Sequence, residues 1–118
     1  MVACLAALPL RAEDVHPHGR AAAEESVRKL VVAPGLEAKL FACEPTIVNP
    51  SAMDVDSKGR VWIAEGANYR LFQKWGKLRP GGDRLVILED ADGDGFGEKA
   101  TTFYQGDEIN TALGVCVV

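Results

Sequence analysis

Three aspartates at alternate positions, followed directly by a glycine, are the residues of this sequence with the clearest chemistry. They are Asp90, Asp92 and Asp94, and the D-x-D-x-D-G pattern that they begin is the first half of a calcium-binding loop. Ca²⁺ takes six to eight oxygen ligands at about 2.3–2.6 Å, and a tightly curled loop turns alternate carboxylates toward one centre. The seventh and ninth loop positions supply a main-chain carbonyl and a further side chain. The expected metal ligands are Asp90, Asp92, Asp94, Phe96 through its carbonyl, and Glu98.

The residues that follow the aspartates separate this loop from an EF-hand. An EF-hand has a bidentate Glu at position twelve, where this chain has Thr101, and a helix should follow. Residues 100–104 are instead β-branched and aromatic, which predicts a strand. We therefore expect a calcium loop between two strands; the alternative is an Asp- and Gly-rich turn that binds no ion. Repulsion favours the ion, because two carboxylates about 4 Å apart repel by about 4 kcal/mol at an effective dielectric of 20.

The elements that must hold this loop are predicted to be antiparallel strands preceded by one short helix. Residues 21–32 are good helix formers with acidic residues early and basic residues late, and Val27, Leu30 and Val31 are candidates for a buried stripe. Residues 56–59 form a turn that predicts a hairpin, and the apolar residues 61–64 suggest a sheet covered on both faces. The expected strands are 36–43, 51–56, 60–65, 84–89 and 98–104, with a sixth beginning at 114 and running to Val118.

Length and composition are those of one small globular domain. The chain has 118 residues, 47% hydrophobic and 25% charged, and a net charge of −4, which argues against general nucleic-acid binding. No apolar run is long enough to span a membrane. The cysteines have no metal-binding spacing; Cys43 and Cys116 are expected to be small buried residues, with a disulfide between them as the alternative.

The first residues resemble a secretory leader. Residues 1–10 are apolar and are followed by a small-residue cleavage site, with processing expected after Ala12, although a basic n-region is missing. A disordered apolar N-terminus is the alternative. Residues 13–20 then form a polar linker that contains His16 and His18, which have no third metal ligand nearby. These features predict a secreted or periplasmic protein, an environment that suits weak calcium sites.

Four motifs follow one another along the chain: Pro34–Ala42, Asn49–Asp56, Gly59–Glu65 and Leu88–Gly95. In this order they resemble the N-terminus of the membrane-bound dehydrogenase-like proteins of planctomycetes and their relatives. Those large secreted proteins open with a β-propeller similar to soluble glucose/sorbosone dehydrogenases. The resemblance implies that residues 21–118 are the N-terminal part of a β-propeller, an antiparallel meander of one to two blades that needs further blades downstream. It also implies that the loop calcium is structural.

The resemblance also bears on catalysis. The full-length relatives suggest a sugar or alcohol substrate and pyrroloquinoline quinone as cofactor, whose carboxylates would need Arg or Lys partners. The basic loop 66–83, with Tyr69 and Arg70, is a candidate wall for that cofactor, and an ordinary solvated loop is the alternative. Glu65 is a weak candidate for a general base. No catalytic residue is assigned, because the sequence contains no arrangement for nucleophilic catalysis.

Two functions therefore remain open. The first is the N-terminal segment of a secreted dehydrogenase-like propeller, inactive alone. The second is a calcium-stabilised propeller without redox chemistry that serves as a binding or scaffold module. A free-standing small calcium-binding protein is a third interpretation.

Overall fold

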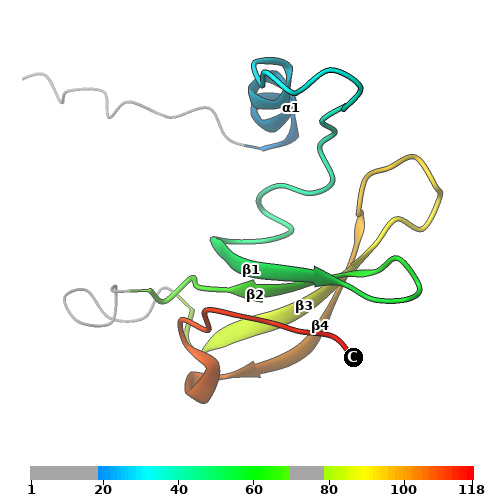
Figure 1. The fold of residues 1–118 in the computed structure, drawn as a ribbon. Helices are drawn as coiled ribbons and strands as arrows, with labels where there is room; N and C mark the ends of the chain where they lie inside the picture. The colour runs from blue at the N-terminus through cyan, green and yellow to red at the C-terminus, as the bar shows by residue number, and fades with distance from the viewer. Residues whose placement is uncertain (1–18, 70–78) are drawn as a thin grey trace, which may run out of the picture.

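The computed structural model describes residues 19–69 and 79–118, which form a mainly β structure with one short helix. The four strands form one open antiparallel sheet in the order β1-β2-β3-β4, so that each strand pairs with its neighbour in sequence (Figure 1). The predicted leader 1–12 and most of the predicted linker 13–20 lie outside the described residues. The elements are α1 (Arg20–Arg28), β1 (Pro50–Val55), β2 (Val61–Glu65), β3 (Asp83–Glu89), β4 (Lys99–Gly106) and a 3₁₀ turn at Asp107–Ile109.

The hairpin between β1 and β2 confirms the turn predicted at residues 56–59. Asp56 Oδ1 accepts hydrogen bonds from the amides of Lys58 (2.9 Å) and Arg60 (3.0 Å). Gly59 takes a φ of 78°, which glycine adopts without a steric penalty. The Trp62 indole donates to Asp56 Oδ2 (3.0 Å), and this bond is the main cause of a strongly lowered Asp56 pKa. The turn is therefore fixed by one ionised side chain.

The core lies on one face of the sheet. It consists of Val61 and Ile63 from β2, Val86 and Leu88 from β3, and Ile47 from the preceding loop, with Phe41 and Ala42 packed against them. The opposite face carries the buried side chains of Ala64 and Ile87 and an edge-to-face contact between Trp62 and Phe103 at 4.8 Å. The strands over 51–56, 60–65, 84–89 and 98–104 are confirmed within one or two residues at each end.

The predicted strand 36–43 is wrong. The Phe41 carbonyl accepts the Gly97 amide (2.7 Å), but Gly97 lies in the connection between β3 and β4 and not in a strand. The segment crosses the apolar face instead of joining an edge, so that Phe41 packs on the core while Leu36 stays exposed. We call residues 36–47 the strap.

The predicted sixth strand, 114–118, is also absent. Side chains of β1 bind this segment in place of a backbone ladder: Ser51 Oγ donates to the Ala112 carbonyl (2.6 Å), and the Val117 amide donates to Asp54 Oδ2 (2.8 Å). The second bond is the leading cause of a lowered Asp54 pKa. These side-chain bonds hold the segment against β1 without the backbone hydrogen bonds of a strand pair.

Helix α1 is shorter than predicted and has no buried residues. Leu30 and Val31, expected in its buried stripe, lie beyond its end and are 59% and 99% exposed. The helix is supported by ion pairs along its surface, such as Arg20 with Glu24 at 2.9 Å. Figure 1 shows α1 set apart from the sheet, which explains why no apolar face is required.

The two described cysteines are free thiols. Cys43 is half-buried, whereas Cys116 is exposed, so the prediction of a buried apolar role is wrong for Cys116. The alternative disulfide between them is not formed.

Candidate metal centre

The acidic loop connects β3 to β4 and is closed at its base. The register pairs Glu89 with Lys99, and Lys99 Nζ lies 2.7 Å from Glu89 Oε2. The hydrogen bond from Lys99 is the main cause of a lowered Glu89 pKa. Residues 90–98 therefore span a hairpin connection, and the segment after them is a strand as predicted, which excludes an EF-hand.

The four predicted carboxylates lie together. Asp90, Asp92, Asp94 and Glu98 each offer an oxygen, and these oxygens all lie within 4.8 Å of one another. The four side chains are exposed to solvent. Among the described residues, these four carboxylates form the one cluster of His, Cys, Asp or Glu side chains close enough together to hold a metal ion.

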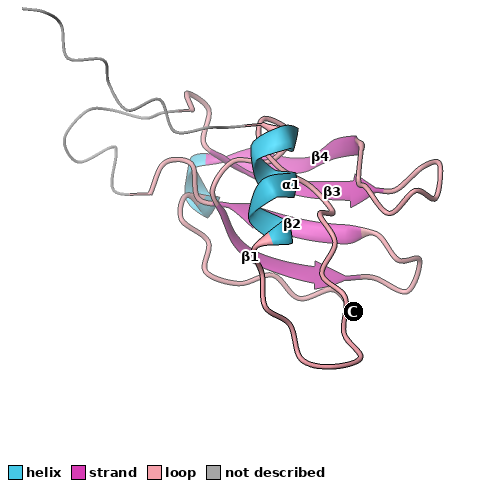
Figure 2. Cartoon of the chain, turned by 90° about the horizontal axis from the view of Figure 1, so that it is seen from above, coloured by secondary structure: helices cyan, strands magenta, loops and turns pink. Residues whose placement is uncertain are grey.

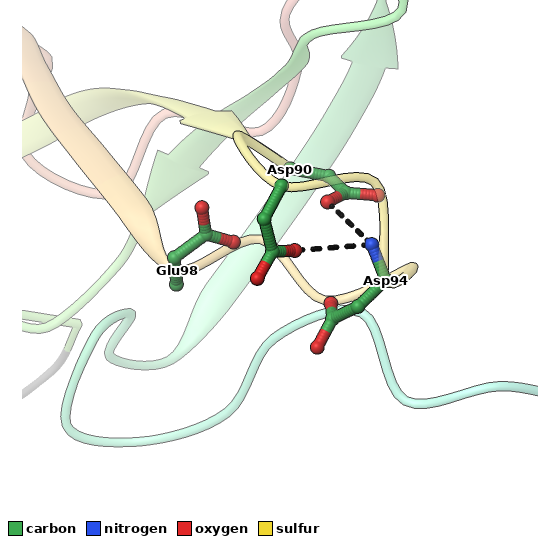
Figure 3. A group of neighbouring side chains, drawn as sticks. Asp90, Asp94 and Glu98 are labelled. Atoms are coloured by element: carbon green, nitrogen blue, oxygen red, sulfur yellow. Dashed lines mark hydrogen bonds between the residues drawn. The ribbon is translucent and has the colours of Figure 1, made fainter.

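Backbone amides fix the position of Asp90 at the centre of the curl. Its Oδ1 accepts the amides of Gly93 (2.7 Å) and Asp94 (3.1 Å), and its Oδ2 accepts the amide of Gly95 (2.8 Å). The Asp94 amide also donates to Asp92 Oδ1 (3.1 Å); Figure 3 shows hydrogen bonds that meet at this amide. The loop thus curls around the Asp90 carboxylate.

Two more bonds orient the remaining acids. Asp94 Oδ1 accepts the Phe96 amide (2.7 Å), and Glu98 Oε1 accepts the Ala91 amide (2.8 Å) across the loop. Gly93 and Gly95 take φ angles of 81° and 91°, which let the chain turn this tightly. The spacing of Asp and Gly in the sequence is therefore what brings the carboxylates together.

Phe96, the fifth predicted ligand, is held on both sides. Its carbonyl accepts the Glu98 amide (3.2 Å) and, with two lone pairs, can accept a second partner. Its ring lies 4.1 Å from the Arg20 guanidinium in a cation–π contact. Arg20 therefore links helix α1 to the acidic loop.

The next residue, Gly97, joins the loop to the core. It is buried, and its amide donates to the Phe41 carbonyl of the strap (2.7 Å). A Cβ at this position would lie 2.8 Å from Phe41 Cε1, so the strap and the loop are in close contact here. The strap therefore contacts the acidic loop at Gly97, between the candidate ligands Phe96 and Glu98.

A second acidic residue, Glu65, is fully buried and belongs to a different cluster. Its carboxylate is 2.7 Å (Oε2) from Arg84 Nε, 2.8 Å (Oε1) from the second Arg84 nitrogen, and in contact with Arg79 Nη1. It also accepts the Val48 amide (2.9 Å). Burial raises the pKa of Glu65, but these hydrogen bonds outweigh it and leave the pKa lowered. Glu65 is consequently an ionised structural residue, and the general-base candidate is not supported.

A third polar cluster closes the base of the basic loop. Asp83 and Asn68 are both fully buried; Asp83 accepts the amides of Asn68 (2.9 Å) and Thr111 (2.9 Å). Asn68 pairs with the backbone of Arg79, and Asn110 accepts the Asp83 amide (2.8 Å). Sequence reasoning missed this cluster because its members are far apart in the chain, and only the placement of Asn and Asp beside turns hints at it.

The candidate wall for a quinone cofactor is largely outside the described residues. This applies to Arg70, Phe72, Lys74, Trp75 and Lys77. The described basic residues at the end of the loop, Arg79 and Arg84, bind Glu65. They do not fit a quinone carboxylate without giving up that buried partner.

The acidic loop, by contrast, suits a hard cation. Its ligands would be carboxylate and carbonyl oxygens, the set that Ca²⁺ prefers. Oxygens within 4.8 Å of one another fit on one coordination sphere, because two Ca–O distances of about 2.4 Å span about 4.8 Å.

In the described part of the chain, no helix has the length and apolar character needed to cross a bilayer.

Comparison with known proteins gives one match. The profile of a family described as a domain of unknown function, DUF7133, matches residues 22–118. No curated protein and no solved structure matches the chain.

Proposed function

The chain belongs to the DUF7133 family, a domain of unknown function, and we propose that it forms a calcium-stabilised blade of a β-propeller. The observation that carries this proposal is the convergence of Asp90, Asp92, Asp94 and Glu98 at the turn between two strands of a four-stranded meander. The role of the ion is structural, since it ties β3 to β4.

The charge of the loop supports a cation. Four carboxylates within 4.8 Å of one another repel, and each already accepts backbone amides that hold it in place. A divalent ion bound by these oxygens offsets this repulsion. Phe96 supplies the carbonyl ligand.

Calorimetric titration of the purified chain with CaCl₂ tests the ion site. The wild-type chain should bind one Ca²⁺, and Asp92→Ala should weaken the affinity at least about tenfold because it removes one charged ligand. Glu37→Ala is the matched control, since Glu37 is an exposed acid of the strap outside the cluster. Equal affinity in wild type and Asp92→Ala, or no binding by the wild type, would reject the assignment.

The sheet supports the propeller part of the proposal. A four-stranded antiparallel meander is the repeating unit of β-propellers, whose neighbouring blades cover one another's faces. In this sheet Met53 and Val55 of β1 are 67% and 52% exposed, beside a groove of about 460 Å³. The groove is lined mainly by apolar side chains, including Leu40, Phe41, Ala42, Ile47, Met53 and Ile63. We propose that a neighbouring blade covers this surface.

The resemblance to dehydrogenase-like proteins extends the proposal to the whole propeller. In that proposal the complete protein is secreted or periplasmic and oxidises a sugar or alcohol, and this segment is inactive alone. Pyrroloquinoline quinone would supply the redox chemistry, but none of the described residues is assigned to it, because Arg79 and Arg84 already bind Glu65. The contribution of this segment is to complete the propeller.

The alternative is a propeller without redox chemistry that serves as a binding or scaffold module. The lowered pKa and full pairing of Glu65 favour it, since they remove the one candidate base in the described residues. The gene beyond the codon for Val118 discriminates between the two. A further blade with a histidine-bearing loop, or a C-x-x-C-H haem motif, would support the dehydrogenase; further blades without either would support the scaffold.

A further inference from the structure

The outer edge of strand β4 pairs with no described segment, and we propose that this edge binds an extended partner segment that carries basic residues. Within residues 19–69 and 79–118, backbone hydrogen bonds join β4 to β3 and to no other segment. The side chains from Lys99 to Gln105 are all exposed. An edge of this kind presents free N–H and C=O groups to which a further strand can add.

The opposite edge of the sheet is protected, which makes the open edge a specific feature. Strand β1 begins with Pro50 and has a register shift between Pro50 and Ala52, both of which hinder pairing. Ser51 and Asp54 also bind the C-terminal segment through Ala112 and Val117. Figures 1 and 2 show β1 and β4 at opposite sides of the sheet.

The residues of β4 suit strand addition. Thr101, Thr102, Phe103 and Tyr104 are β-branched or aromatic. Lys99, of a type that commonly discourages edge pairing, has its charge matched by Glu89 at 2.7 Å. The register shift against β3 falls at Phe103, so the uninterrupted part of the edge is Lys99–Thr102.

Charge indicates which partner fits. Between Leu85 and Glu108 the chain has seven acidic residues and one basic residue, and the acids lie at both ends of β4. An antiparallel pair of two β4 strands would bring the acidic loop of one copy toward Glu108 of the other. The resulting repulsion disfavours pairing with a second copy. A partner segment with basic residues at both ends of its strand is instead attracted to the acidic residues at the ends of β4. A bound Ca²⁺ removes two of these charges and leaves the acidic excess.

Peptide binding to the 118-residue chain tests the charge requirement. The probe is a fluorescein-labelled peptide of alternating Thr and Val with two Lys at each end, and its control has Glu in place of Lys. Fluorescence anisotropy should show binding of the basic peptide at least about tenfold tighter than the acidic one, weakening as NaCl rises. Glu108→Gln should lower this affinity severalfold, and Glu37→Gln should not. Failure of the basic peptide to bind, or equal binding of both peptides, would overturn the proposal.

Proline substitutions test the edge itself. Neighbouring amides of a strand point to opposite edges, so one of Thr101→Pro and Thr102→Pro breaks a bond to β3 and lowers Tm, while the other removes an outward donor. The variant that keeps the wild-type Tm should lose peptide binding about tenfold or more. Unchanged binding in that variant would overturn the proposal. So would a wild-type dimer in solution that this variant abolishes, because the partner would then be a second copy.

Discussion

At the scale of single residues, Glu65 carries a negative charge in the interior of the sheet. Breaking a buried ion pair from one side is costly because the remaining charge stays buried. Glu65 faces Arg79 and Arg84, whose side chains are 20% and 23% exposed. Hydrogen bonding to Glu65 is also the main cause of a raised Arg84 pKa. The cluster therefore depends on the ionised carboxylate.

We predict that Glu65→Gln destabilises the fold by about 3 kcal/mol at pH 7, because it leaves two guanidinium groups without their counter-charge. The folded-state pKa of Glu65 is lowered, so its contribution is complete above the unfolded value of about 4.3 and is lost as the pH falls through the folded value. The difference between wild type and variant should therefore shrink below about pH 4. Urea denaturation at pH 7 and pH 3 measures it, and a difference that is the same at both values would contradict the ionised cluster.

A second prediction concerns Asp56. Asp56→Asn keeps one acceptor oxygen but removes the charge that Arg60 and Trp62 bind in the β1–β2 turn. The Asp56 pKa is lowered, so its contribution is present above about pH 3.9 and is lost in stronger acid. The variant should melt at a lower temperature than wild type at pH 7 and be less sensitive to acid. Circular dichroism melts at pH 7 and in acid, at about pH 3, check this. Asp92→Asn is the control that leaves the β1–β2 turn unchanged.

At the scale of elements, the strap and the acidic loop meet at Gly97. The Gly97 amide bonds to the Phe41 carbonyl, and the Phe41 ring leaves no room for a Cβ. Residue 97 also stands between Phe96 and Glu98, two of the candidate ligands. Packing of the strap and ordering of the ligands should therefore depend on each other.

We predict that Gly97→Ala destabilises the chain by about 1–3 kcal/mol and weakens calcium binding severalfold, because Phe41 must move. Gly114→Ala is the control, since a Cβ there meets no atom within 4 Å. The double variant Gly97→Ala/Phe41→Leu should recover part of the loss, because the smaller side chain frees space. Denaturation and calorimetry give the two values. A Gly97→Ala variant that matches Gly114→Ala in both would show that strap and loop are independent.

The same scale shows how far the sequence predicts this structure. Period-two patterns and the turn at 56–59 identify the four strands, and the spacing of Asp and Gly places the four carboxylates, because both depend on local geometry. Segments 36–43 and 114–118 have strand-like sequences, but tertiary contacts decide their conformation. The first packs Phe41 on the core, and the second is bound by side chains of β1. The bonds of Glu65 to Arg79 and Arg84 cross 14 and 19 residues, so no local pattern reveals them.

At the scale of the whole molecule, the stability of the fold should depend on calcium, because the acidic residues gather at one turn of the sheet. An ion that binds the folded state alone stabilises it by about 2.7 kcal/mol at a concentration one hundred times its dissociation constant. Weak extracellular sites have dissociation constants of about 10⁻⁴–10⁻³ M, so millimolar calcium should be needed. Calcium is therefore expected to set the melting temperature of the whole sheet, since β3 and β4 are joined through the loop.

We predict that 10 mM CaCl₂ raises Tm by about 10 °C relative to EDTA, since each kcal/mol shifts a domain of this size by about 4–8 °C. General screening of the acidic residues would also stabilise the chain, so NaCl of matched ionic strength is the first control. Asp92→Ala is the second, because it keeps most of the acidic charge but lacks a ligand. Scanning calorimetry should show a calcium-specific rise in wild type and little in the variant. Equal shifts in CaCl₂ and NaCl would mean that calcium acts through screening alone and that the acidic turn holds no ion.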